Sequence, residues 1–129
     1  MIDKIAWLEL ADGRILSTRS HGRSRYYLPG GKREPGEEDL DTLTREINEE
    51  LSVQLLPATA RFAGEFHAQA DAQPAGVQVR MRCYECAYQG QLHAASEIAE
   101  LIWLDYADRD LTSPVDQIIF DHLRRQGRL

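Results

Sequence analysis

Residues 31–53 read GKREPGEEDLDTLTREINEELSV, and this stretch carries the strongest structural pattern in the chain. On a helical wheel of 3.6 residues per turn, its apolar residues fall within one arc of about 80°. Those residues are Leu40, Leu43, Ile47 and Leu51. The acids at the start of the stretch suit the positive end of a helix dipole, and Pro57 ends any continuation. The pattern therefore predicts an amphipathic helix over residues 37–51 that packs its apolar stripe against a core.

Three carboxylates lie on a separate arc of this predicted helix, next to the apolar stripe. Glu46, Glu49 and Glu50 stand at positions i, i+3 and i+4, where like charges repel and destabilise an isolated helix. A hard divalent cation between them would remove that repulsion, and Mg²⁺ or Mn²⁺ takes oxygen ligands of this kind. On the wheel alone, a solvent-facing acidic helix explains the same spacing equally well, so both interpretations stay open.

The linear spacing around these acids resembles the Nudix box, Gly-x5-Glu-x7-Arg-Glu-U-x-Glu-Glu-x-Gly-U, where U is a bulky aliphatic residue. Eight of its nine specified positions match: Gly31, Glu37, Arg45, Glu46, Ile47, Glu49, Glu50 and Val53. The chain is thereby identified as similar to the MutT-like members of the Nudix hydrolase family. The resemblance implies an α/β (α+β) fold, the Nudix-type α/β/α sandwich, in which a mixed β-sheet is flanked by helices. It also implies a divalent-metal enzyme that cleaves a diphosphate bond.

The resemblance implies a role for each matching side chain. Glu46, Glu49 and Glu50 would bind the metal, and Glu46 is also the family's usual candidate for the base or for a second metal. Gly31, or Gly30 before it, would offer a backbone carbonyl to the metal. The catalytic set would comprise Glu46 and Glu49 with two supporting residues. Of these, Arg45 would orient a carboxylate of the box by a charge-assisted hydrogen bond, and Glu37 would brace the loop that opens the helix.

Two positions outside this set complete the expectation. Family members often recruit a further acid from a later loop, and Glu97 is the best placed candidate for this metal ligand, with Glu85 and Glu100 as fallbacks. Ser52 is the one departure, because the family has Gly there. The position follows the helix, where a left-handed backbone is common and Gly suits it best. A Ser in that conformation would cost on the order of 1 kcal/mol, unless the turn adopts another geometry.

The charge of the chain is unevenly distributed. Its net charge of −6 argues against broad binding to nucleic acid or to anionic membranes. Residues 13–33 nevertheless hold six cations and no acid, whereas residues 34–50 hold eight acids and Arg45 alone as counter-charge. Two solvated faces of opposite sign explain this pattern, and so does a phosphate chain beside its metal. The expected substrate-binding residues are Arg19, Arg25 and Lys32 for phosphates, and Tyr27 and Leu28 beside a base or leaving group.

The rest of the sequence predicts strands and one more helix. Residues 2–10 and 14–18 read as a hairpin around the Asp12-Gly13 turn, whereas Pro29-Gly30-Gly31 breaks the chain. Further strands are expected at 61–69, 77–89 and 100–104. A last helix is expected over 114–125, with Ser113 as its N-cap and Ile118, Ile119 and Leu123 as core residues. Cys83 and Cys86 form a C-x-x-C, but on a strand they face opposite sides and cannot share a metal.

Length and composition indicate a single domain over residues 1–129. The absence of a signal peptide and of a membrane-length apolar run favours a cytoplasmic location. The expected partner is a small-molecule nucleotide or other diphosphate, with no membrane; homodimers are common in the family. The expected reaction is hydrolysis of a (d)NTP to the monophosphate and pyrophosphate. Dinucleotides, 5′-triphosphorylated RNA ends and a non-catalytic nucleotide-binding domain are the alternatives, and Asp116 or Gln117 could read a base edge.

Overall fold

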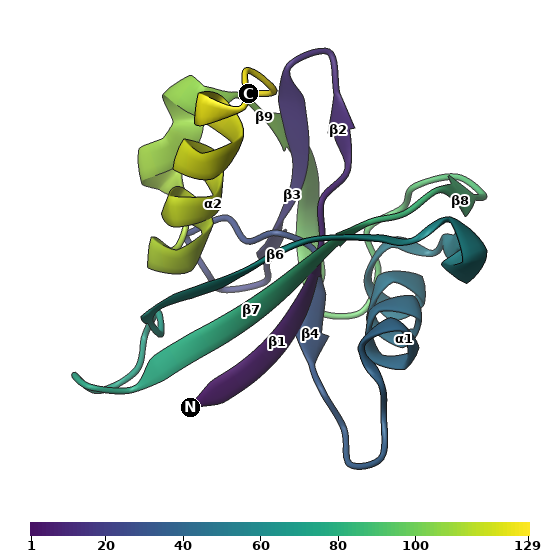
Figure 1. The fold of residues 1–129 in the computed structure, drawn as a ribbon, viewed down its shortest axis with the longest axis horizontal. Helices are drawn as coiled ribbons and strands as arrows, with labels where there is room; N and C mark the ends of the chain where they lie inside the picture. Colours follow the sequence, from purple (N-terminus) through teal and green to yellow (C-terminus); the bar gives the residue numbers. More distant parts are fainter.

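The computed structural model describes residues 1–129, in which four strands precede the first helix and five more strands precede the second (Figure 1). The strands are β1 (Ile2–Trp7), β2 (Leu10–Ala11), β3 (Arg14–Ser20), β4 (Gly30–Lys32), β5 (Gln54–Leu55), β6 (Arg61–Gln69), β7 (Gln78–Glu85), β8 (Tyr88–Gln89) and β9 (Ile98–Leu104). The helices are α1 (Asp39–Leu51) and α2 (Pro114–Arg125), with 3₁₀ turns η1 (Pro57–Thr59) and η2 (Tyr106–Leu111). Neither helix is long and apolar enough to cross a membrane.

The strands form a mixed sheet and two smaller ones. The larger sheet has the order β4-β1-β7-β6, in which β1 runs parallel to β7 and the other neighbours are antiparallel. A second sheet has the order β2-β3-β9, and β5 pairs with β8. The parallel pairing of β1 with β7 joins segments from the two halves of the chain, so the centre of the larger sheet is built from residues distant in sequence.

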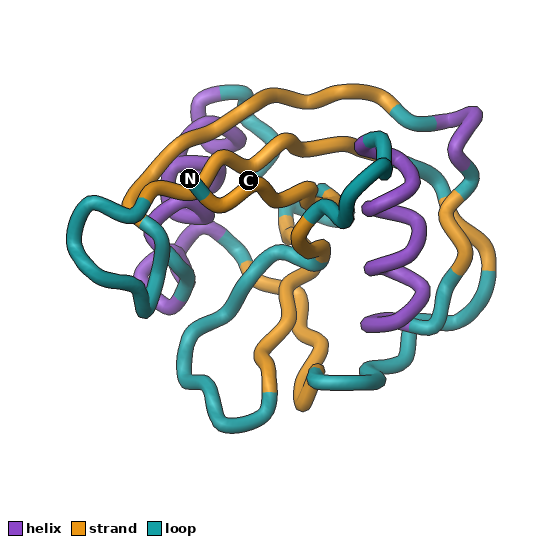
Figure 2. Tube along the Cα trace, turned by 90° about the horizontal axis from the view of Figure 1, so that it is seen from below, coloured by secondary structure: helices purple, strands orange, loops and turns teal.

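The two helices cover opposite sides of the strands (Figure 1). Side chains of β1 alternate between two cores, because successive residues of a strand point to opposite faces. Ile5 and Trp7 pack with the apolar stripe of α1, whereas Ala6 lies in the core that α2 completes with Ile119 and Phe120. Figure 2 shows the same separation of the helices from below. The predicted sandwich of helix, mixed sheet and helix is therefore confirmed.

The predicted strand over residues 2–10 is divided between two sheets. β1 ends at Trp7, and β2 pairs with β3 around Asp12 and Gly13, whose φ values of 53° and 72° give the left-handed turn expected of a tight hairpin. The predicted strand over 77–89 likewise breaks at Cys86, whose Sγ donates to the carbonyl oxygen of Leu56. Cys83 and Cys86 are free thiols in opposite cores, as expected, although Cys86 lies just beyond the end of β7.

The ends of the helices follow local chemistry. α1 begins two residues later than predicted, at Asp39, and the Asp41 carboxylate accepts a hydrogen bond from the backbone N–H of Glu38. The helix ends at Leu51, and its C-cap residue Ser52 takes the left-handed conformation with φ of 64°. α2 begins at Pro114 and ends at Arg125, as predicted. The expectation that Ile118 is a core residue is wrong, because its side chain is exposed on the outer face of α2.

Candidate active site

Two glycines bring β4 unusually close to its neighbours, and this approach builds the site. The segment predicted to break the chain at Pro29-Gly30-Gly31 instead runs into β4, which pairs with β1. At Gly30, with φ of 144°, an added Cβ would lie 2.0 Å from the carbonyl oxygen of Ile5. At Gly31 an added Cβ would lie 2.3 Å from the carboxyl carbon of Glu46. Only residues without a side chain allow β4 to lie so close to β1 and to α1.

Three carboxylates meet beside these glycines, and we call Glu46, Glu50 and Glu97 the three-carboxylate cluster. One oxygen of each lies within 4.8 Å of the others. Glu46 and Glu50 are one turn apart on α1, and the loop before β9 carries Glu97. That loop is tied to the helix end, because the N–H of Ala95 donates to the Glu50 carbonyl oxygen at 2.9 Å.

Two acids of this cluster, Glu46 and Glu50, are withdrawn from water, whereas Glu97 is exposed. Burial raises the pKa of Glu50 to about 8, although the N–H of Gly30 donates to its Oε1 at 3.1 Å. Burial also raises the pKa of Glu46. A hydrogen bond from Ser96 instead lowers the pKa of Glu97. Three oxygen ligands that repel one another in this way fit a hard divalent cation, which would neutralise them.

Glu49 lies outside the three-carboxylate cluster. Its side chain is 53% exposed, and its Oε2 lies 3.9 Å from Nη1 of Arg45. Arg45 itself is held by Glu37, with its Nε and Nη2 each donating at 2.8 Å to the two carboxylate oxygens. The same guanidinium donates to Glu46 Oε1 at 2.9 Å, and it lowers the pKa of Glu37 to about 2. Arg45 therefore links the loop before α1 to the carboxylates on the helix.

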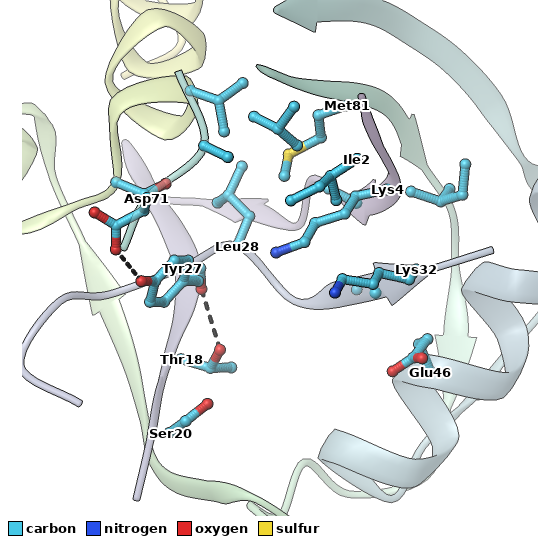
Figure 3. Close-up of a pocket in the computed structure, with 18 of the residues that line it drawn as sticks. Ile2, Lys4, Thr18, Ser20, Tyr27, Leu28, Lys32, Glu46, Asp71 and Met81 are labelled. Carbon is cyan, nitrogen blue, oxygen red and sulfur yellow. Dashed lines mark hydrogen bonds between the residues drawn. The ribbon is translucent and has the colours of Figure 1, made fainter. Parts of the chain in front are cut away.

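A cavity of about 380 Å³ opens from the three-carboxylate cluster along the sheet (Figure 3). Its acidic end is the cluster with Gly30 and Gly31. Its apolar end consists of Ile2, Leu28, Ala70, Val79, Met81 and Val115. Lys4 and Lys32 lie between the two ends (Figure 3), and Tyr27, Arg23, Thr18 and Ser20 also line the space. Tyr27 donates its hydroxyl proton to Asp71, which attaches the loop after β6 to the same wall.

The expected substrate-binding residues divide into two groups. Lys32, Tyr27 and Leu28 line the cavity. Arg19 and Arg25 do not line it: Arg19 Nε pairs with Glu100 at 3.1 Å, and Arg25 Nη1 donates to the Thr112 carbonyl oxygen at 2.7 Å. The fallback acids are occupied as well, because Glu85 pairs with Arg128 and Glu100 with Arg19.

Near the last helix, Asp116 and Gln117, the residues considered for base recognition, make hydrogen bonds within the protein. Asp116 is fully buried and accepts from the N–H of Leu28 at 3.1 Å, and the Gln117 amide donates to the Thr112 carbonyl oxygen at 3.0 Å.

Lys4 and Arg23 line the cavity although the sequence did not single them out. A signal for Lys4 is present in the sequence. It is a cation in an otherwise β-like run, at a position that shares its strand face with Ile2 and Ala6. Arg23 lies in the basic loop between β3 and β4, where nothing in the spacing separates it from Arg19 and Arg25.

Comparison with known proteins places this geometry in a family. The family model described as NUDIX domain matches residues 5–123. Among solved structures, the chain resembles the ORF135 protein of E. coli, with 26% identity, coverage of 96% of this chain and 91% of that one, and a TM-score of 0.68. It also resembles the MutT NUDIX hydrolase of Burkholderia pseudomallei (24% identity, 92% and 94% coverage, TM-score 0.71).

A third similar structure is the MutT protein of Methanosarcina mazei Go1, with 18% identity, coverage of 99% of this chain and 96% of that chain, and a TM-score of 0.77. No curated protein sequence matches the chain significantly. The family model spans nearly the whole chain and includes β4, α1 and the loop that carries Glu97. The chain therefore belongs to the Nudix family, and it is a Nudix-type hydrolase of acid anhydride bonds.

Proposed function

We propose that residues 1–129 act as one catalytic domain that hydrolyses nucleoside diphosphate-linked substrates with a bound Mg²⁺ or Mn²⁺. The preferred substrate is a (d)NTP, which gives the nucleoside monophosphate and pyrophosphate. The observation that carries this proposal is the continuous cavity, in which the three-carboxylate cluster is followed by two lysines and then by an apolar end. Such a sequence of surfaces matches a metal, a phosphate chain and a base in that order.

The donor set supports a hard cation at the acidic end. Glu46, Glu50 and Glu97 would be its carboxylate ligands, with Glu49 able to join them from the exposed side of α1 and Gly31 offering its carbonyl. When bound, the cation would neutralise phosphate charge and help lower the pKa of the attacking water. Arg45 would keep Glu46 in position through their hydrogen bond, and Glu37 would in turn hold Arg45.

The reaction itself needs a base and a leaving group. A water oxygen forms a bond to one phosphorus of the anhydride while the bridging P–O bond breaks, and the bridging oxygen leaves with the other phosphate. A carboxylate of α1 that keeps an oxygen free of the metal, Glu46 or Glu49, would accept the proton of the water. Lys32 lines the same cavity as these carboxylates and would bind the phosphate chain of the substrate. Tyr27 and Leu28 would border its organic group.

Arg19 and Arg25 would contribute only if they left their present partners. Arg19 is held by Glu100, and Arg25 by Thr112 and, at 3.5 Å, by Asp71. We expect them to attract the polyphosphate at long range and Lys32 to contact it. Dinucleotides and 5′-triphosphorylated RNA ends remain the alternative substrates. The cavity volume of about 380 Å³ favours a mononucleotide over either of them, since it lies at the lower end of small-ligand pockets.

A substrate panel with Mg²⁺ tests the proposal. Each (d)NTP, a dinucleoside polyphosphate and a 5′-triphosphorylated RNA are incubated with the protein and with inorganic pyrophosphatase, and released phosphate is measured. We expect turnover of at least one (d)NTP, and its loss in Glu49→Gln with the fold retained. Asp110→Asn, which removes an acid that is 91% exposed, is the matched control and should keep full activity. No turnover of any substrate would refute the proposed (d)NTP hydrolysis and favour a nucleotide-binding role.

A further inference from the structure

Lys4 presents a largely buried ammonium group to the cavity without any partner for its charge. It lies in the middle of β1, and burial lowers its pKa. Its nitrogen makes no hydrogen bond and no ion pair; its one aromatic contact is with the ring of Tyr27, at 5.8 Å from the centroid. Glu50 and Asp116 favour the charged form from a distance, but neither lies within ion-pair range. Removing a cation from water in this way costs free energy unless an anion pairs with it.

A second ammonium group lies directly beside the first. Lys4 and Lys32 are cross-strand partners in the antiparallel pairing of β1 with β4, and their side chains extend into the cavity side by side (Figure 3). Lys32 also has no ion-pair partner, and its charge lowers the pKa of Lys4. Like charges opposite each other in a sheet are destabilising. An anion bound between the two ammonium groups would relieve this repulsion.

The register of the sheet places this site at the boundary between the two ends of the cavity. On one side of Lys4, towards β4 and α1, lie Lys32, Gly31 and Glu46. On its other side, towards β7, the register partner is Met81, which belongs to the apolar end. A substrate with its organic group in the apolar end and its anhydride at the three-carboxylate cluster must pass its first phosphoryl group over Lys4.

We propose that Lys4 binds the phosphoryl group joined directly to the organic part of the substrate, with Lys32 beside it. The ligand class is an organic phosphate whose organic group fits the apolar end, and a nucleoside 5′-phosphate is the simplest member. This inference rests on the proposed function for the direction in which the substrate lies. It goes beyond that function by naming the residue that makes the substrate's first phosphate a requirement for binding.

The test is a binding measurement that needs neither metal nor turnover. Calorimetric titrations in EDTA compare AMP, GMP, CMP and UMP with the four unphosphorylated nucleosides. At least one monophosphate should bind the wild type about tenfold or more tightly than its nucleoside. Lys4→Met, which keeps the length of the side chain, should remove this advantage and change nucleoside affinity by less than about twofold. Lys4→Arg, which keeps the charge, should restore most of it.

Arg61→Met is the matched control, because it removes a cation that is 75% exposed and outside the cavity, and it should bind both ligands like the wild type. Equal or undetectable binding of the phosphorylated and unphosphorylated forms by the wild type would overturn the inference. An equal loss of both ligands in Lys4→Met would overturn it as well, since a structural role would have that effect. Absence of hydrolysis on the substrate panel would refute the proposed function and leave this binding result standing.

Discussion

Ser52 follows the last residue of α1 and joins the helix to the loop that leads to Glu97. It does so in a left-handed conformation that L residues disfavour. Its φ is 64°, its N–H donates to the Asn48 carbonyl oxygen, and its Oγ donates to the His93 carbonyl oxygen at 3.3 Å. Gly adopts this conformation freely, which explains why Gly is the residue expected at this position of the box. The hydroxyl that ties the helix end to the loop leading to Glu97 accounts for why Ser is tolerated.

Ser52→Gly is expected to raise the free energy of unfolding by about 0.5–1 kcal/mol, because relief of the left-handed strain exceeds the added chain entropy and one weak hydrogen bond. Urea denaturation measures this difference. Ser52→Ala, which keeps the strain and loses the hydroxyl, should be no more stable than the wild type. A Gly variant less stable than the wild type would show that the His93 contact is the larger effect.

Asp116 is a second residue whose environment has a measurable consequence. It is fully buried, its Oδ2 accepts from the N–H of Leu28, and its Oδ1 has no partner. Burial raises its pKa from 3.8 to about 6. Because the folded state holds the proton more tightly than the unfolded state, the stabilising contribution is complete below the unfolded pKa. It is lost as the pH rises through the folded pKa.

Asp116→Asn keeps the group neutral at every pH and leaves an oxygen to accept from Leu28. We expect the variant and the wild type to be similar in stability near pH ~4, and the variant to be more stable by up to about 3 kcal/mol near pH ~8. Denaturation curves over this pH range provide the measurement. A difference that does not change with pH, or one that grows in favour of Asp, would contradict the assigned burial effect.

At the scale of elements, the site depends on the approach of β4 to α1. Gly31→Ala tests this approach, because the new Cβ would fall 2.3 Å from the carboxyl carbon of Glu46. Glu46 is a flexible side chain, so the fold should persist while its carboxylate moves away from Glu50 and Glu97. We expect kcat to fall by about tenfold or more, since displacements near 1 Å in an active site have effects of this size or larger.

Gly36→Ala gives the opposite pattern and serves as the contrast. Gly36 has φ of 84° with nothing near its Cβ position, so its substitution should cost on the order of 1 kcal/mol of stability and leave kcat unchanged. Equal activity of Gly31→Ala and the wild type would mean that the contact with Glu46 has no role in positioning.

Some element boundaries could be predicted from the sequence and others could not, for physical reasons. β6 and α2 have the predicted bounds, because turn residues flank the strand and Ser113-Pro114 starts the helix. The division of residues 2–10 could not be predicted, because the apolar run continues through Leu8 and Leu10 while the chain passes from one sheet to another. Pairing with distant strands, not local pattern, decides where β1 ends.

At the scale of the whole molecule, the carboxylates of α1 could be predicted from the sequence, whereas the rest of the site could not. The spacing on α1 gathers Glu46 and Glu50 within one helix, so a local pattern predicts their proximity. Lys4 meets Lys32 and Met81 only because β1 pairs with both β4 and β7. Likewise, Arg19 and Arg25 pair with Glu100 and Asp71 and do not line the cavity. These acids lie far along the chain, so only the folded structure shows the pairing.

The three-carboxylate cluster would bind a divalent cation at the end of this cavity, and every proposed step at the site depends on this binding. Titration of Mn²⁺, followed by its electron paramagnetic resonance signal, tests it most directly. Glu50→Gln should weaken Mn²⁺ binding by about tenfold or more relative to the wild type, whereas the exposed control Asp110→Asn should stay within about twofold. Equal Mn²⁺ affinity in the wild type and Glu50→Gln would contradict binding of the cation at this cluster.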